Sequence, residues 1–253
     1  MFTTKSTSRP APVTKPPSCH EMALLVISHG SEVCDGPNRQ LIGQVEKLRK
    51  TDCFAKVQGA VLYGEPSVEA ALSALGDTPV HIVPMFMCDG LFTQKIIPAR
   101  IKELIHEKQD ITFAKPVGLS EGLASVILDR IKSSLVSDGY LEQEVRVVLI
   151  GHGSTANNSS QRATDQQASR LRAISDFKSV DTTFLDQPPY FSNVLPNLQG
   201  PVYAIGMFAA DGLHAGIDIP SQISKMSDKK ETHYLGAIGN SPAMIDLLHK
   251  CCM

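Results

Sequence analysis

The stretch LLVISHGS at residues 24–31 occurs a second time, as VVLIGHGS at residues 147–154. A second pair of segments follows the same plan, because MFMCDGLF at residues 85–92 returns as MFAADGLH at residues 207–214. The offsets are 123 and 122 residues, so the chain consists of two halves built on one plan. Such halves are expected to form two similar lobes that face a shared cleft.

The two copies differ at one chemically important position. The first copy has His29 in its first segment and Phe92 at the end of its second. The second copy has a histidine at both places, His152 and His214. This asymmetry indicates that the chemistry belongs mainly to the second half.

Composition and charge restrict the class of protein. With 42% hydrophobic and 20% charged residues, the 253-residue chain has enough apolar mass for two cores. A net charge of −2 provides no basic surface, so we expect no nucleic-acid partner. The longest apolar run near a terminus, residues 23–27, is too short to span a membrane. Six cysteines without CxxC spacing suggest neither a zinc ribbon nor a disulfide framework, so we expect a reducing, cytoplasmic location.

Two polar stretches set the expected domain boundaries. Residues 1–22 are rich in Pro, Ser, Thr and Lys, which favours a disordered tail. Cleaved organelle transit peptides have a similar composition, so plastid import is the alternative interpretation. The stretch 137–144 contains an Asp-Gly turn signal and predicts the linker between a lobe at 23–143 and a lobe at 144–253.

Within each lobe, apolar runs typical of strands alternate with segments of helical periodicity. This alternation predicts an α/β fold, with a parallel sheet of about four strands in each lobe and helices on both faces. Glu65-Pro66-Ser67 predicts a helix start capped by Ser67, and Gly76 its stop. The strands are expected at residues 23–27, 56–62, 80–86 and 112–116, and then at 145–150, 180–185, 201–206 and 232–237.

The histidines follow the ends of strands that are expected to be neighbours. Sites in open parallel sheets lie outside the carboxyl ends of the strands, so His29, His152 and His214 should project toward the same edge. His152 and His214 should converge from adjacent strands. Gly30 and Gly153 lack a Cβ, which allows a flat ligand to approach the backbone beside each imidazole.

An imidazole titrates near neutral pH and ligates divalent metals as the neutral base. Two of them can hold a metal ion loosely or accept protons from an N–H acid. Zinc sites usually have three or four ligands, so His152 and His214 predict a transient metal rather than a resident one.

The carboxylates near these strand ends have alternative interpretations. Asp218, four residues after His214, either orients that imidazole or caps the helix expected from Pro220. Asp186 follows a strand and is a candidate carboxylate. Asp89 and Asp211 occupy equivalent places in the two copies, which favours a shared turn or cap role.

These motifs resemble the sirohydrochlorin chelatases of the CbiX type, in their long two-repeat form. The resemblance covers the chain from about residue 23 onward. It is carried by LIGHGS at 149–154, MF at 207–208, GLH at 212–214 and DIP at 218–220.

The resemblance implies a chelatase-type fold with a tetrapyrrole in the cleft between the lobes. It implies that His152 and His214 are the catalytic, metal-ligating pair, and we expect His29 to assist from the opposite lobe. Phe92 replaces the second histidine of the first half and Ile96 its aspartate, so that half should not insert metal alone. The expected substrate contacts are Gly30, Ser31, Phe92, Gly153 and Ser154.

The expected function is insertion of Co²⁺ into sirohydrochlorin with release of two protons, a lyase activity in cobalamin biosynthesis. Fe²⁺ insertion for sirohaem is the alternative in the same class, and a non-catalytic tetrapyrrole or metal carrier is the alternative outside it. No dinucleotide or P-loop motif accompanies either first strand, which argues against a nucleotide-binding protein.

The expected partners are sirohydrochlorin and the divalent metal, bound by a monomer or homodimer. The family's histidine-rich and iron–sulphur tails are absent from the sequence, so we expect no permanent cofactor, with Co²⁺ or Fe²⁺ as substrate. Arg39 and Arg162 each follow a strand-end histidine by ten residues and are candidates for holding the substrate's carboxylates.

Overall fold

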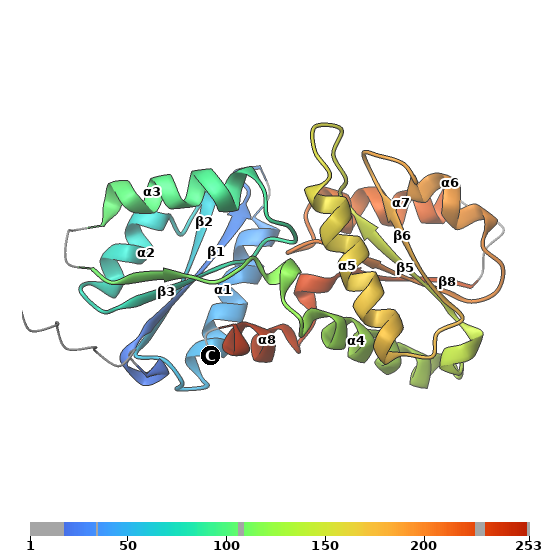
Figure 1. The fold of residues 1–253 in the computed structure, drawn as a ribbon, viewed down its shortest axis with the longest axis horizontal. Helices are drawn as coiled ribbons and strands as arrows, with labels where there is room; N and C mark the ends of the chain where they lie inside the picture. Colours follow the sequence, from blue (N-terminus) through green and yellow to red (C-terminus); the bar gives the residue numbers. More distant parts are fainter. Residues whose placement is uncertain (1–17, 34, 106–108, 226–230, 252–253) are drawn as a thin grey trace, which may run out of the picture.

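The computed structural model describes residues 18–33, 35–105, 109–225 and 231–251. These residues form two parallel four-stranded sheets with helices on both faces, which confirms the predicted fold class (Figure 1). Residues 1–17 of the expected tail, which was predicted to span residues 1–22, lie outside the described residues. At its end, Cys19–Glu21 form a single 3₁₀ turn.

Both sheets have the same strand order, β2-β1-β3-β4 in the first and β6-β5-β7-β8 in the second. In this order the first strand of each half lies beside a switch point, where ligands of open α/β sheets bind. The strands of the first sheet are β1 (Ala23–Gly30), β2 (Lys56–Tyr63), β3 (Val80–Pro84) and β4 (Ile111–Phe113). Those of the second are β5 (Arg146–Gly151), β6 (Ser179–Phe184), β7 (Val202–Gly206) and β8 (Thr232–Ala237).

The helices of the first half are α1 (Gly36–Arg49), α2 (Val68–Leu75), α3 (Ile97–Leu104) and α4 (Leu123–Asp138). Those of the second half are α5 (Ser159–Ile174), α6 (Phe191–Val194), α7 (Ile219–Lys225) and α8 (Met244–Lys250). As predicted, Ser67 caps α2, because its hydroxyl accepts a hydrogen bond from Ala70 N–H at 3.2 Å, and Gly76 ends that helix.

The first strands are apolar throughout because both of their faces are buried. In β1, Leu24 and Val26 pack in a cluster with α1, whereas Leu25 and Ile27 pack in a second cluster with α2 and α3. Successive side chains of a strand point to opposite faces, so this alternation places one helix layer on each side. The second lobe repeats the pattern, with α6 and α7 on the outer face.

The closing helix of each half packs on the lobe of the other half (Figure 1). Helix α4 lies along α5, and Arg130 of α4 donates to Leu235 O of β8 at 3.1 Å. Helix α8 packs against α1, where the rings of His249 and Phe54 are 5.7 Å apart. One apolar cluster therefore runs through both lobes.

Two buried glutamines join the lobes at equivalent places. Gln167 of α5 donates from its amide to Gly118 O at 2.8 Å and Ser120 O at 2.9 Å, in the turn that leads into α4. Gln44 of α1 donates to Gly239 O, in the turn that leads into α8. A Cβ on Gly118 or Gly239 would overlap the backbone of Met87 or Ala209, so only glycine allows each turn to lie on a loop of the cleft.

The helix expected from Pro220 begins earlier, at Ile219, and the equivalent helix of the first half, α3, likewise begins before its Pro98. A π-helical turn precedes each of them, η2 (Phe92–Ile96) in the first half and η6 (His214–Asp218) in the second. Proline has no N–H to donate to the carbonyl four residues before it, which weakens α-helical pairing at this place. Instead, Ile97 N–H donates to Phe92 O, five residues back. The expected linker at 137–144 is also shorter, because α4 continues to Asp138.

Among the described residues, no helix has both the length and the apolar character needed to cross a bilayer.

Because each closing helix packs on the opposite lobe, the halves exchange their closing helices. This exchange leads to a prediction about Leu248, a fully buried residue of α8. Replacing it with alanine should lower the free energy of unfolding by about 2–5 kcal/mol, because a cavity remains in the core. Amide hydrogen exchange should accelerate in α1 of the first lobe and not in α5. Lys250→Ala, at an exposed position of the same helix, is the control. Faster hydrogen exchange confined to α5 would contradict the packing of α8 on the first lobe.

Candidate active site between the lobes

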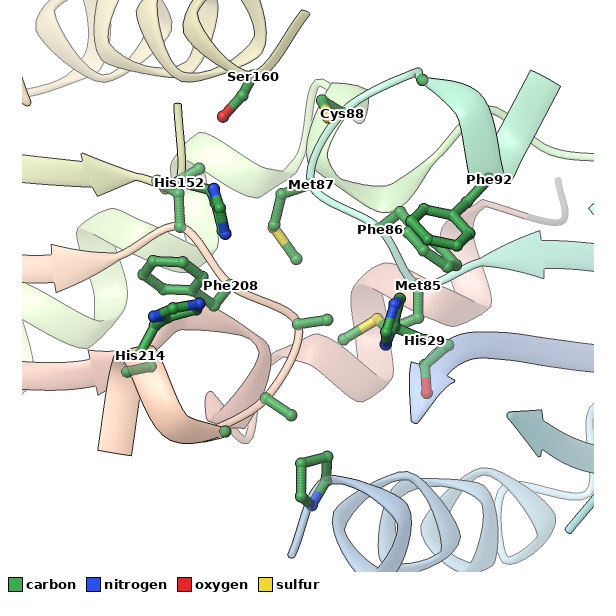
Figure 2. A pocket seen from close by; sticks show the side chains of 18 of the residues that line it. His29, Met85, Phe86, Met87, Cys88, Phe92, His152, Ser160, Phe208 and His214 are labelled. Carbon is green, nitrogen blue, oxygen red and sulfur yellow. The ribbon is translucent and has the colours of Figure 1, made fainter. Parts of the chain in front are cut away.

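A cleft of about 550 Å³ lies between the lobes, at the carboxyl ends of the strands. Both halves line it, largely with apolar side chains that include Met85, Phe86, Phe92 and Phe208 (Figure 2). Among the described residues, no Asp, Glu, Lys or Arg lines it. The cleft therefore suits a flat, largely apolar ligand rather than a compact anion.

The predicted histidine pair lies in this cleft. His152 follows β5 and His214 opens η6, after the neighbouring strand β7. Their ring centroids are 5.0 Å apart and the rings are perpendicular (Figure 2). The side chains are 47% and 50% exposed, so both rings reach the cleft and neither is enclosed in the core.

Each imidazole of this pair lies beside a carboxylate. His214 Nδ1 donates to Asp218 Oδ2 at 2.9 Å. His152 Nδ1 lies 3.1 Å from Gly153 O and 3.2 Å from Asp186 Oδ2. Acceptors at Nδ1 hold the proton on that nitrogen and leave the lone pair of Nε2 available to a metal ion or a proton.

These contacts decide the alternatives that the sequence left open for the aspartates. Asp218 orients His214 and does not cap α7, because the chain is already helical from His214 onward. Asp186, at the end of β6, is the matching carboxylate for His152. Asp89 and Asp211 both form hydrogen bonds with the surrounding structure, but not the shared ones that were expected, because Asp89 accepts within its own turn and Asp211 accepts from β8 and the turn after it. Asp89 accepts from Thr93 at 2.7 Å, and Asp211 from Ala237 N–H at 2.9 Å.

The first half has aromatic rings where the second has its acid–base groups. The His29 ring lies 4.8 Å from the ring of Tyr63 and 4.9 Å from that of Phe92. Tyr63, the last residue of β2, corresponds in the repeat to Asp186, which lies two residues after β6. Phe92 opens its π-helical turn as His214 opens the other. His29 keeps one contact of its counterpart, since its Nδ1 lies 2.9 Å from Gly30 O.

Four of the five expected substrate contacts line the cleft, and one does not. Gly30, Phe92, Gly153 and Ser154 line the cleft. Ser31 is outside the lining, and its hydroxyl accepts from Val33 N–H at 3.2 Å. The physical reason for the glycines also differs from the expected one. Gly153 has φ +80° and its Cβ would lie 2.7 Å from Gln187, so the turn itself requires glycine.

The candidate arginines are also outside the cleft lining. The Arg39 side chain is 74% exposed and forms an ion pair with Asp35, one helical turn away. Arg162 is exposed on α5. No cation of the described residues therefore faces the ligand space, and neither arginine is positioned to hold a carboxylate there.

The cleft brings two imidazoles together, those of His152 and His214, as candidate ligands for a metal ion. In the described part of the chain, no three His, Cys, Asp or Glu side chains gather as a potential metal site. Cys88 lines the cleft, but burial and, to a lesser extent, the charge of Asp89 raise the pKa of its thiol. The thiol stays protonated at neutral pH and is a poor ligand. Two protein ligands with open positions suit an ion that is passed on.

Sequence reasoning missed two residues of the cleft and one contact beside it. Met87 and Cys88 line the cavity where the second half has Ala209 and Ala210. Tyr63, outside the lining, lies tilted against His29. The repeat contained a signal for them, because Met87 and Cys88 align with Ala209 and Ala210, and Tyr63 aligns with Asp186.

Comparisons with known proteins agree with this geometry. The family model described as CbiX matches residues 23–134 and 146–252. A probable sirohydrochlorin cobaltochelatase of Halobacterium salinarum is 24% identical, with 89% of each chain covered. A sirohydrochlorin ferrochelatase of Priestia megaterium is 24% identical over 64% of this chain and 62% of its own. The structure of SirB from Bacillus subtilis with Fe³⁺ has a TM-score of 0.79 and 21% identity, covering 92% of this chain and 94% of that one.

The contact between Asp218 and His214 makes a testable prediction. Asp218→Ala removes the acceptor that orients the imidazole, so the affinity for Co²⁺ should fall about 10–100-fold. A Co²⁺ titration followed by visible absorption measures it, with Asp129→Ala, an exposed aspartate of α4, as the control. Unchanged affinity in Asp218→Ala would show that this carboxylate does not support the imidazole.

Proposed function

The chain belongs to the CbiX family, and from this premise we propose that it inserts a divalent metal ion, with Co²⁺ favoured, into sirohydrochlorin. The observation that carries the proposal is the perpendicular pair His152 and His214, each beside its own carboxylate, at the edge of an apolar cleft. The relatives named as sirohydrochlorin chelatases support the substrate, and the probable cobaltochelatase that matches 89% of the chain supports cobalt.

The reaction exchanges one divalent ion for two pyrrole N–H protons, so a site needs a temporary metal ligand and a base for each proton. The Nε2 lone pairs of His152 and His214 serve as the temporary metal ligands. As the ion moves to the nitrogens of the macrocycle, each imidazole loses its metal bond and becomes free to accept a proton. A base with a pKa near neutral pH is suited to this step.

His29 acts from the opposite lobe in this proposal. Its Nδ1 faces Gly30 O, which leaves Nε2 free to hydrogen-bond with a pyrrole N–H from the opposite face, while the two released protons go to His152 and His214. Phe92 lies beside it and presents a ring to the macrocycle, a contact worth about 0.5–1.5 kcal/mol beyond the area buried. Gly30, Gly153 and Ser154 form the backbone rim of the same space, with Ser31 just outside it.

The neutral lining of the cleft indicates how the substrate lies. Sirohydrochlorin carries carboxylates around a flat ring, and no described cation of the cleft pairs with them. The proposal is therefore that the ring enters between the lobes and its carboxylates remain toward water. Metal is substrate in this proposal and no resident cofactor takes part. The two repeat units, 23–143 and 144–253, act together in a cytoplasmic monomer or homodimer.

The test is a spectrophotometric insertion assay with sirohydrochlorin and either Co²⁺ or Fe²⁺. Wild-type protein should accelerate insertion, and His214→Ala should lose at least about 100-fold in rate while it folds normally, since it lacks half of the ligand pair. His20→Ala, an exposed histidine outside the cleft, is the control. Turnover retained in His214→Ala would overturn the assignment, and faster Fe²⁺ insertion would make iron the substrate.

A non-catalytic carrier is separated by the same assay, because it would bind Co²⁺ or the macrocycle without accelerating insertion over the protein-free reaction.

A second prediction follows from the position of the arginines. Arg39→Ala and Arg162→Ala should each leave the KM for sirohydrochlorin within about twofold of wild type, because exposed charges away from the ligand are screened by solvent. Steady-state kinetics at fixed ionic strength measure this. A KM raised about tenfold in either variant would show that substrate carboxylates reach that side chain.

A further inference from the structure

One side chain of the first half reaches across the cleft to the loop that carries His214. The amide of Gln40, in α1, donates from Nε2 to Ala209 O at 3.3 Å. Its Oε1 accepts from Asp211 N–H at 3.4 Å. Gln40 therefore pairs with a carbonyl and an N–H of the same loop, as a neighbouring backbone segment would.

The surrounding contacts place this bridge against the start of α1. A Cβ on Gly36 would lie 4.0 Å from Asp211 O, and a Cβ on Gly212 would lie 3.8 Å from Pro37. The first turn of α1 thus approaches the loop closely. The loop itself is made of alanine and glycine around Asp211, so its side chains provide little packing of their own.

The loop leads directly to the catalytic imidazole. Gly216 N–H donates to Gly212 O at 2.8 Å at the start of the turn that contains His214. From the other side, the carboxylate of Asp211 holds Ala237 N–H of β8 and the side chain of Asn240. Gln40 and Asp211 together fix the loop between the two lobes.

Among the described residues, no side chain of the second half forms the equivalent bridge to the loop of the first half. The position that corresponds to Gln40 is Ala163, which is buried and has no amide group. Gln44 and Gln167, in contrast, form their contacts in both halves. The additional glutamine therefore occurs only where it supports the loop before the second histidine.

We propose that Gln40 is a positioning residue for His214, supplied to the second lobe by the half that lacks the second histidine. Both imidazoles of the pair are half-exposed, so packing alone does not fix their separation. Holding Ala209 and Asp211 sets where η6 begins and thus where the ring of His214 lies relative to His152. Only the turnover readout of this inference rests on the proposed function.

The test compares Gln40→Ala with Gln40→Met, which keeps the volume of the side chain but removes its hydrogen bonds. Misplacement of a catalytic group by about 1 Å costs up to 100-fold, so we expect kcat for insertion to fall about tenfold in both variants, with KM within about twofold. The dissociation constant for Co²⁺ alone should rise about fivefold to tenfold. Glu46→Ala, an exposed residue of the same helix, is the matched control.

A readout that needs neither metal nor substrate keeps this inference separate from the proposed function. The ¹H–¹⁵N correlation peaks of the His214 imidazole should move in both Gln40 variants, while those of His29 stay in place. Unmoved His214 peaks would overturn the positioning role even if wild-type protein proved inactive. Gln40→Met with wild-type peaks and kcat would also overturn it, because hydrogen bonding would then be unnecessary.

Discussion

The contact of a carboxylate with Nδ1 of each imidazole is the constraint on which the chemistry of the cleft depends. Asp218 and Asp186 keep the proton of His214 and His152 on the side away from the ligand space. The two rings follow neighbouring strands with centroids 5.0 Å apart, in a cleft whose described lining has no Asp, Glu, Lys or Arg. Without these acceptors the rings would be free to present either nitrogen.

The unequal repeat separates chemistry from support. The first half replaces both carboxylates and one histidine with Tyr63, Ile96 and Phe92, yet it keeps the sheet, the strand-end histidine and the interlobe glutamine. Gln44 and Gln40 extend from it to the second lobe. A half that has lost a ligand set can therefore remain necessary, because the other half depends on it for geometry.

The sequence predicted those features that local pattern controls. Apolar runs located the strands, and the histidines at their ends located the site, because parallel strands bring their carboxyl ends to one edge. The sequence left two roles open for Asp218, because spacing alone did not distinguish a helix cap from a group that orients His214. The exchange of α4 and α8 and the bridge from Gln40 to Ala209 were not predictable, because both join positions distant in sequence through packing that no periodicity encodes. The π-helical turns were missed because proline normally marks a helix start.

The exchange of closing helices also has a consequence for synthesis on the ribosome. The first lobe is translated first, but the helix that covers the face of its sheet beside α1 is made only after the second lobe. Until then, the nascent first lobe lacks the packing of α8 on α1 and the contact of His249 with Phe54. Neither lobe can complete its fold before the other exists, and the growing chain needs protection from aggregation during that interval.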